Sequence, residues 1–193
     1  MNRTKKLISD TFWELLEEKS YNRITVQNIV ERCQLNRNTF YYYFQDIPLL
    51  AEYSIREWTE QVIQDNCVFG MPEKAIVLIA KELMKRKNAF LHIYRSSCGE
   101  RLIRHLNELA LHLVELYIDG ITEKVIMPDE NRVVITRFYK CIFMGLLLDW
   151  MDGEVSYDLP GFCEKVCEIF AGVDELIFMT RLGTCNVGAE ENS

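Results

Sequence analysis

TVQNIVERCQLNRNTFYYYFQDIPLL, residues 25–50, has the pattern of a short helix, a tight turn and a second helix dense in tyrosine. Thr25 and Asn36 stand where the two helices would begin, and both are residue types that cap a helix N-terminus. Because a helix turns by about 100° per residue, the consecutive tyrosines at 41–43 cannot all face one core. A short helix with Arg, Asn, Thr and Tyr at exposed positions suits a DNA major groove, so the segment favours DNA binding.

Helical periodicity continues on both sides of this segment, and no alternating strand pattern extends beyond a few residues. We therefore expect an all-α protein. Asp46 followed by Pro48 predicts the start of a fourth helix, because the first turn does not need the N–H that proline lacks. The other helices are expected over about 3–18, 71–87, 88–97, 100–124, 129–152 and 160–182.

This pattern divides the chain into three parts. We expect an N-terminal three-helix bundle with a helix-turn-helix over 1–46, a larger helical regulatory domain over 47–182, and a flexible tail over 183–193. The net charge is −7, yet residues 1–45 hold seven basic and five acidic side chains. A mildly basic N-terminal part joined to an acidic remainder fits a DNA-binding module attached to a regulatory domain that the DNA phosphates repel.

No run of the sequence approaches the roughly 18 apolar residues that a membrane helix needs. Acidic residues interrupt the N-terminal segment where a signal peptide would be apolar. We therefore expect no membrane partner and a cytoplasmic location.

The opening segment resembles the N-terminal domain of the tetracycline-repressor (TetR) family of bacterial regulators. That family's usual pattern is Thr-Val-x-x-Ile-Ala, a small-Gly-Val-Ser turn and Thr-Phe-Tyr-x-x-Phe, against TVQNIV (25–30), CQLN (33–36) and TFYYYF (39–44) here. The resemblance covers about residues 7–50. Two positions depart from it: Gln34 replaces the turn glycine, and Ile47 replaces a lysine that contacts phosphate. A left-handed backbone at Gln34 would cost about 1 kcal/mol.

The resemblance implies double-stranded DNA as the partner and assigns roles by position. The side chains implied to touch base edges are Gln27, Arg37, Asn38 and Tyr41. Amide side chains match adenine N6 and N7, and arginine matches guanine O6 and N7. Hydroxyls and helix N-terminal amides would hold phosphates at Thr25, Thr39, Tyr42 and Tyr43.

The resemblance also implies that the last two helices pack against their copies in a dimer. The sequence supports this independently, because both helices are apolar over more than one stripe and so need a second partner surface. We expect a homodimer whose interface includes Ile142, Gly145, Leu146, Trp150, Phe162, Val166, Ile169, Phe170 and Val173. Two-fold symmetry then predicts a near-palindromic operator with half-sites about 34 Å apart.

A small-molecule effector pocket is implied for the fourth to seventh helices. Aromatic walls with a few polar groups are typical of such pockets. The candidates are Trp58, Phe90, His92, Tyr94, His105, Tyr117, Phe138 and Phe143. At each single position, core packing is the stronger interpretation. His105 and His112 share a helix face but lack a third ligand of recognisable spacing, so we expect no metal and no cofactor.

Seven cysteines without C-x-x-C spacing are interpreted as reduced thiols. Cys163 and Cys167 are four residues apart, which leaves a redox-sensor hypothesis open beside simple packing. No nucleotide-binding, metalloprotease or serine-hydrolase motif occurs, so we do not expect an enzyme. We expect a dimeric repressor that a small molecule releases from its operator. The alternative is a TetR-like coactivator whose C-terminal domain binds a protein partner in place of a metabolite.

Overall fold

The structure is a computed structural model that describes residues 3–66, 72–122 and 127–170. The N-terminal part, which we call the head, contains α1 (Arg3–Glu18), a 3-10 turn (Tyr21–Arg23), α2 (Val26–Cys33) and α3 (Arg37–Tyr43). The remaining part, the body, contains α4 (Ile47–Asn66), α5 (Pro72–Lys85), α6 (Lys87–Tyr94), α7 (Gly99–Thr122), α8 (Asp129–Asp152) and α9 (Leu159–Phe170). Within the described residues all regular structure is helical, so the all-α prediction is confirmed.

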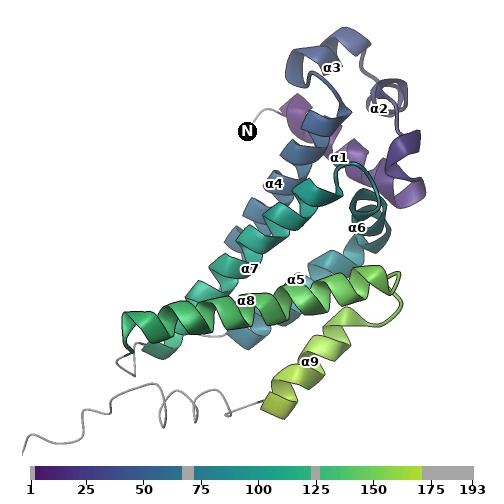
Figure 1. Ribbon diagram of the computed structural model, residues 1–193. Coiled ribbons are helices and arrows are strands. Elements are labelled where there is room, and N and C mark those ends of the chain that lie inside the picture. The colour runs from purple at the N-terminus through teal and green to yellow at the C-terminus, as the bar shows by residue number, and fades with distance from the viewer. Residues whose placement is uncertain (1–2, 67–71, 123–126, 171–193) are drawn as a thin grey trace, which may run out of the picture.

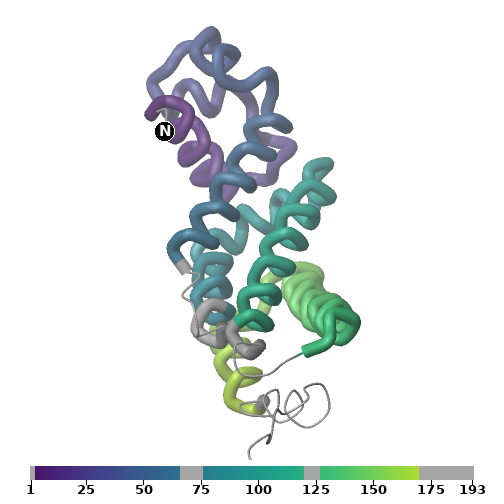
Figure 2. The backbone as a smooth tube through the Cα atoms, turned by 90° about the vertical axis from the view of Figure 1, so that its left-hand side faces the viewer, coloured from purple at the N-terminus to yellow at the C-terminus, as the bar shows by residue number. Residues whose placement is uncertain are grey.

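The molecule is elongated, with the head at one end (Figure 1). From the head, α4 and α7 run side by side toward the other end, in contact along their length. Figure 2 looks nearly along α8, which therefore lies across this long axis and packs on α7. The last described helix, α9, packs mainly against α5. This arrangement holds α3 far from the apolar helices at the opposite end.

The head forms because each of its helices has one apolar stripe. On α1 the buried stripe includes Ile8, Phe12 and Leu16, which recur at helical spacing. It meets Ile29 from α2 and Phe40 from α3, and both of these side chains are fully buried. The short helices α2 and α3 therefore derive their stability from a shared core, since helices of this length are marginal alone.

The predicted caps of α2 and α3 are present. The Thr25 hydroxyl accepts the backbone N–H of Asn28 at 3.2 Å, and the Asn28 side chain accepts the N–H of Thr25 at 3.1 Å. At α3, the Asn36 side-chain oxygen accepts the backbone N–H of Thr39 at 2.8 Å. These reciprocal bonds fix where each helix begins and so set the direction in which α3 projects.

Gln34 takes the left-handed conformation that the resemblance assigned to glycine, with φ 55° and ψ 39°. Its N–H donates to the carbonyl of Glu31 at 3.2 Å, closing the end of α2. The turn between α2 and α3 therefore has the left-handed backbone conformation that glycine favours, although glutamine occupies the position. A non-glycine residue there costs on the order of 1 kcal/mol.

Helix starts in the body follow the predictions with one correction. The Asp46 carboxylate accepts the N–H of Leu49 at 2.8 Å, as expected for the start of α4. Asp129 was expected to cap α8, but Pro128 occupies the capping position and Asp129 is the first helical residue. Its carboxylate still lies in the first turn, where negative charge favours the helix dipole. The predicted loop at 67–72, the end of the last helix and the tail fall largely outside the described residues.

Candidate nucleic-acid interface

The outer side of α3 carries three of the four residues assigned to base contacts, together with Tyr42, which was assigned to phosphate. Arg37, Asn38, Tyr41 and Tyr42 are all exposed, and we call these four the α3 face. Tyr42 keeps 80% of its surface and Tyr41 54%, values high for tyrosine in a folded chain. Phe40 directly precedes these tyrosines in sequence and is fully buried, so it anchors the helix. The prediction that not all three tyrosines at 41–43 could be buried is confirmed.

Three further hydroxyls were assigned to phosphate contacts, and they differ in how available they are to a phosphate. They belong to Thr25, Thr39 and Tyr43. The Thr25 oxygen accepts a backbone N–H, which leaves its own proton able to reach a phosphate. The Thr39 hydroxyl donates to Asn36 at 3.1 Å, so a phosphate would have to displace that bond. Tyr43 is half-buried, and its ring packs edge-on against Tyr42 with centroids 4.8 Å apart.

Gln27 on α2 meets Arg37 at the start of α3. The Arg37 Nε group donates to the Gln27 side-chain oxygen at 3.0 Å. The Gln27 amide nitrogen donates in turn to the Glu31 carboxylate, one helical turn further along α2. The structure thus brings two of the predicted base-contact residues into direct contact with each other.

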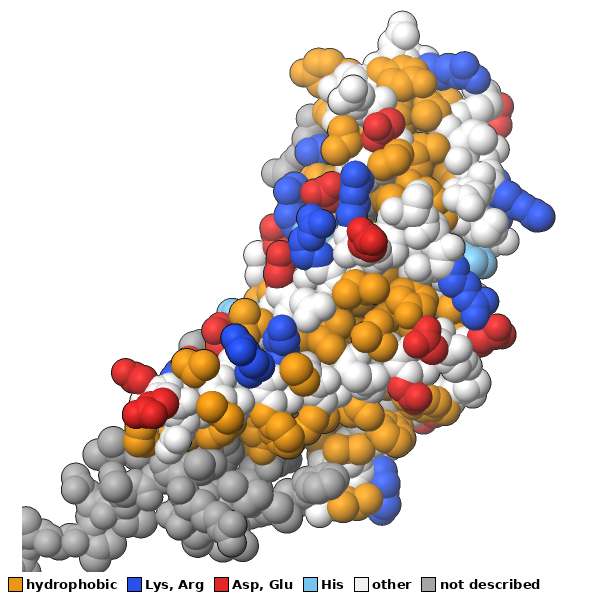
Figure 3. All heavy atoms as spheres, in the orientation of Figure 1, with side chains coloured by type: hydrophobic (Ala, Val, Ile, Leu, Met, Phe, Trp, Pro, Cys, Tyr) orange, Lys and Arg blue, Asp and Glu red, His pale blue; other side chains and the backbone are white. Residues whose placement is uncertain are grey.

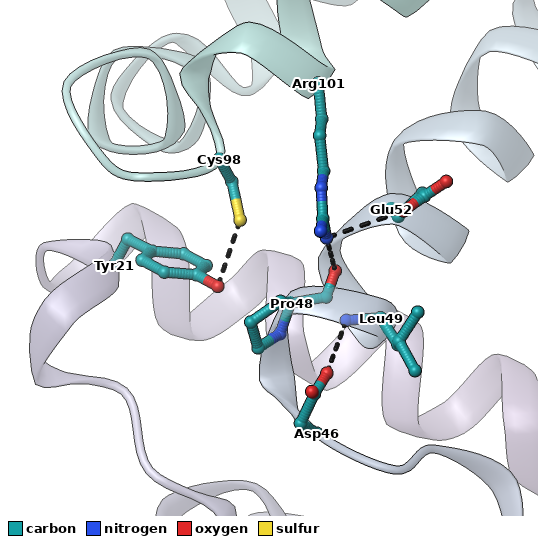
Figure 4. A network of polar contacts seen from close by, with 7 residues as sticks. All are labelled: Tyr21, Asp46, Pro48, Leu49, Glu52, Cys98 and Arg101. Atoms are coloured by element: carbon teal, nitrogen blue, oxygen red, sulfur yellow. Dashed lines mark hydrogen bonds and ion pairs between the residues drawn. The ribbon is translucent and has the colours of Figure 1, made fainter.

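Polar contacts join the base of the head to the start of α7 (Figure 4). The Arg101 guanidinium on α7 donates to the Pro48 carbonyl oxygen at 3.1 Å and lies 3.4 Å from the Glu52 carboxylate. Both acceptors belong to the first turns of α4. Close by, the Cys98 thiol donates to the Tyr21 hydroxyl at 3.1 Å. Burial raises the pKa of Tyr21 well above its ordinary value, and the contact with Cys98 raises this pKa further.

A second set of contacts joins α1 to α6. The Glu17 carboxylate accepts the N–H of Ala89 at 3.1 Å, close to the N-terminus of α6. His92 Nδ1 lies 2.7 Å from the Leu16 carbonyl oxygen and must carry a proton to donate there. The Trp13 and Phe90 rings pack with centroids 5.5 Å apart. The head is therefore fixed to the body by α6 as well as by α7.

The predicted effector-pocket residues do not form one group. Trp58 and Phe90 lie together, with ring centroids 4.7 Å apart and both side chains buried. The Nε1 of Trp58 is a buried donor without a hydrogen-bond partner among the described residues. Tyr117, in contrast, packs against Tyr139 in a separate small cluster between α7 and α8.

The remaining pocket candidates have contacts of other kinds. Tyr94 donates its hydroxyl proton to Asp152 at 2.8 Å. His105 Nδ1 lies 3.2 Å from the Glu108 carboxylate on the same helix. Phe143 packs at the edge of the main core, and Phe138 is 60% exposed. Trp58 and Phe90 are therefore the two candidates whose rings contact each other in the main core, whereas Tyr117 and Phe138 both pack on Tyr139.

An apolar surface runs along the outer side of α8 (Figure 3). Its exposed members, which we call the α8 face, are Val133, Val134, Phe138, Cys141, Ile142 and Gly145. A Cβ atom added at Gly145 would meet nothing within 4 Å. Leu146 on the same helix is half-buried. On α9, Phe162 and Ile169 are exposed and Val166 is half-buried. Among the residues that the structure describes, none covers this face of α8, which lies at the end of the molecule opposite α3.

One expected interface residue lies inside the protomer. Trp150 is fully buried, and its Nε1 donates to the Tyr157 carbonyl oxygen at 3.2 Å. It therefore does not reach the surface that a second copy would touch, and its expected place at the interface is wrong. The Phe170 side chain and all of Val173 lie outside what the structure describes.

Both parts of the chain match known families. Residues 8–48 match the family described as "Bacterial regulatory proteins, tetR family". Residues 71–172, more than half of the chain, match the TetR model described as "Transcriptional regulator C-terminal region". The chain belongs to the TetR family. As a TetR-family protein it is a DNA-binding transcriptional regulator with the all-α fold of that family.

Individual relatives with the TetR fold share low sequence identity with this chain. The chain is 25% identical over 91 residues to the HTH-type dhaKLM operon transcriptional activator DhaS of Lactococcus lactis subsp. lactis (strain IL1403). That match covers 47% of this chain and 49% of the relative, so it spans about half of the curated relative's length.

Solved structures extend the likeness to nearly the whole fold. A dihydroxyacetone kinase operon activator, DhaS, aligns over 94% of this chain and 99% of its own, with a TM-score of 0.78 and 17% identity. A tetR-family regulator from Streptomyces coelicolor aligns over 93% and 84%, with a TM-score of 0.70 and 11% identity. NalD, the secondary repressor of the MexAB-OprM multidrug efflux pump in Pseudomonas aeruginosa, aligns over 86% and 94%, with a TM-score of 0.57 and 16% identity.

Thiol and metal chemistry receive little support in this TetR-family chain. Burial, together with the neighbouring Cys167 thiol, raises the pKa of Cys163 to about 11. A thiol with so high a pKa is almost fully protonated near pH 7, which disfavours the redox-sensor hypothesis. Among the described residues, no three His, Cys, Asp or Glu side chains come together as a metal site. Nor does any helix in the described ranges reach the length and hydropathy needed to cross a membrane.

Sequence reasoning missed the contacts that join the head of this TetR-family regulator to its body. Tyr21 and Cys98 are 77 positions apart, and Leu16 and His92 are 76 apart. Glu17 alone provided a partial indication of these contacts in the sequence. An acidic side chain at the end of α1 can cap the N-terminus of another helix, as Glu17 does for α6.

Proposed function

We propose that this TetR-family regulator binds a near-palindromic operator as a homodimer, represses transcription there, and is released when a small molecule binds its body. The observation that carries the proposal is the α3 face, where polar and aromatic side chains project outward from a helix anchored by buried Phe40. A short helix fixed in this way can enter a major groove as a rigid element. Such a regulator acts where chromosomal DNA lies, in the cytoplasm.

The contacts with DNA divide into two kinds. Arg37, Asn38 and Tyr41 are proposed to touch base edges, and Gln27 lies behind Arg37. Phosphates are proposed to be held by the hydroxyls of Thr25, Thr39, Tyr42 and Tyr43. Phosphate contacts set affinity and register, whereas base contacts set sequence preference. Residues 1–46 would form the DNA-binding unit and residues 47–182 the regulatory unit.

The proposed dimer uses the α8 face together with α9. An exposed apolar face in a protein of this size needs a partner, and a second copy satisfies this need by two-fold symmetry. The residues that would lie at or near this interface are Ile142, Gly145, Leu146, Phe162, Val166 and Ile169. The sequence prediction adds Phe170 and Val173. Because the α8 face lies opposite the head, dimerisation there leaves both α3 faces free.

The proposed switch depends on the contacts between head and body. An effector can shift the equilibrium only if it binds the DNA-competent and released conformations with different affinity. A molecule near Trp58 would contact the Phe90 ring, which packs on Trp13 of the head. The unpartnered Nε1 of Trp58 would favour a ligand with a hydrogen-bond acceptor. The other pocket candidates would be packing residues in this arrangement.

A second candidate is an activator that recruits a protein partner through its body. The observation that favours it is the likeness to DhaS, which is described as an operon activator both as a sequence relative and as a solved structure. Against it, NalD shares the same fold and is described as a repressor. The sign of regulation therefore needs a functional test.

The test is selection of bound duplexes from a random pool at moderate salt, with wild type beside Arg37→Ala. We expect wild type alone to enrich a palindrome, which is then placed within or upstream of a promoter and transcribed in vitro. Reduced transcription would support the repressor, and increased transcription that depends on a copurified protein would support the second candidate. Failure of wild type to enrich any sequence would overturn the proposal.

A further inference from the structure

Three side chains at the junction of α2 and α3 form a hydrogen-bonded series. Arg37 is the first residue of α3, and its Nε group donates to the side-chain oxygen of Gln27 at 3.0 Å. The Gln27 side-chain nitrogen donates to the carboxylate of Glu31, four residues later on α2. The left-handed turn at Gln34 is what brings the start of α3 back against the start of α2.

The two bonds determine how the Gln27 amide is oriented. Arg37 Nε can only donate, so it requires the amide oxygen, and the Glu31 carboxylate can only accept, so it requires the amide nitrogen. Flipping the amide would break both bonds at once. Both polar atoms that Gln27 would need for a bidentate contact with adenine thus already make one hydrogen bond within the protein, and these bonds aim the amide at Arg37 and Glu31.

The same bonds leave the terminal nitrogens of Arg37 able to contact a base. A guanidinium has five N–H donors in one plane, and only the Nε donor is used by Gln27. The two terminal nitrogens remain able to donate in parallel to guanine O6 and N7. Holding Nε also restricts the plane of the group, which reduces the conformational entropy that a long side chain loses on binding.

We propose that Gln27 is a positioning residue that holds Arg37 to read a guanine, and that Glu31 holds Gln27 in the required amide orientation. This inference rests on the proposed function and refines it, because the sequence had assigned Gln27 to a base of its own. The predicted recognition element is then a guanine at one position in each half-site, with no separate base read by Gln27.

The test compares selected sequences and Kd values for wild type, Gln27→Met, Arg37→Ala and the double variant. Methionine keeps the length of glutamine and its suitability for a helix but lacks its hydrogen bonds. Arg37→Ala should lose the guanine preference, which a bidentate contact makes about 5- to 150-fold. Gln27→Met should weaken the preference at that same base pair by about 3- to 10-fold.

Two further readouts separate positioning from a structural effect. Adding Gln27→Met to Arg37→Ala should change nothing more, because the residue that it positions is already absent. Glu31→Gln should keep the preference, since its side-chain oxygen still accepts from Gln27, whereas Glu31→Ala should weaken it. Circular dichroism of each variant should show unchanged helix content and melting temperature.

Two outcomes would overturn the inference. A changed preference at a different base pair in Gln27→Met, additive with Arg37→Ala, would mean that Gln27 reads a base directly. An unchanged preference in Gln27→Met would mean that Arg37 needs no support. If wild type enriches no sequence at all, the proposed function itself fails, and that result is distinct from both.

Discussion

The guanidinium of Arg101 donates to the carbonyl oxygen of Pro48 at 3.1 Å, which ties the start of α7 to the first turn of α4. The same group lies 3.4 Å from the Glu52 carboxylate, one turn further along α4. Only residues 44–46 separate this turn from the end of α3. One side chain of α7 therefore helps to fix the angle between α3 and α4.

Replacing Arg101 with methionine should loosen that angle without unfolding the protein. The pair with Glu52 is more than a third exposed, so its loss should lower the free energy of unfolding by at most about 1 kcal/mol. We expect weaker binding to the selected operator and a smaller penalty when the half-site spacing is changed by one base pair. Fluorescence anisotropy with a series of spacings measures both.

Arg104→Met is the matched control for this variant, because Arg104 is an exposed arginine on the same helix. It should behave as wild type on every spacing. Equal spacing discrimination in Arg101→Met and wild type would show that Arg101 does not hold the head.

Introducing glutamate at Gly145 should separate the proposed dimer into folded monomers. Nothing in the protomer lies within 4 Å of a Cβ atom at this position, so the protomer has room for a side chain. A charge buried between two copies would be costly to desolvate. Light scattering should report half the mass of wild type, with helix content by circular dichroism maintained.

Asn88→Glu introduces the same charge at an exposed position of α6, away from the α8 face, and should leave the mass unchanged. A Gly145→Glu protein that remains dimeric would place the interface elsewhere on the molecule.

Removing the hydroxyl of Tyr42 should weaken binding to all duplexes by a similar factor. Tyr42 is 80% exposed, so Tyr42→Phe should leave stability within about 0.5 kcal/mol of wild type. Loss of one phosphate hydrogen bond should cost about 0.5–1.5 kcal/mol, or roughly 2- to 13-fold in Kd. The measurement is Kd for the selected operator and for unrelated duplexes, side by side. A change confined to one base pair would instead make Tyr42 a base contact.

The Cys163 thiol should react slowly with an alkylating reagent near neutral pH. Its pKa is raised to about 11, chiefly by burial, so very little thiolate is present at pH 7.5. Mass spectrometry should find Cys163 alkylated to a large extent only as the pH approaches 11. Rapid modification of Cys163 at pH 7.5 would contradict this and would revive the redox hypothesis.

The same raised pKa has a consequence for stability. The folded chain keeps the Cys163 proton at a pH where the unfolded chain has already lost it. Its contribution to stability is therefore complete below the ordinary thiol pKa and declines as the pH rises toward 11. Urea unfolding of wild type and Cys163→Ala at pH 7 and pH 10 should show a smaller difference between the two proteins at pH 10.

Sequence reasoning predicted the local features of the fold well, because their causes lie within a few residues. The capping bonds of Thr25 and Asn36 each join positions three apart, and the apolar stripe of α1 follows from helical spacing alone. The exposed tyrosines of α3 could be predicted for the same reason.

The side of α8 that faces inward could not be predicted in this way. Apolar residues occur all around this helix, so its sequence does not identify the core side. The structure buries Met144, Leu147 and Trp150 and leaves Val134 and Phe138 outside. Which of two apolar sides packs on α7 depends on contacts distant in sequence, and Trp150 was misassigned for that reason.

The packing of α1 and the 3-10 turn after it against α6 and Cys98 has a consequence for how this protein folds. Trp13 and Tyr21 belong to the head, yet Phe90 and Cys98 complete their surroundings. A fragment cut at residue 46 would leave this aromatic surface in water, at a cost of about 25 cal/mol for each Å² of apolar area. We therefore expect one cooperative melting transition for the whole protomer, so that any ligand that raises the melting temperature of the body also protects the amides of α1 from hydrogen exchange.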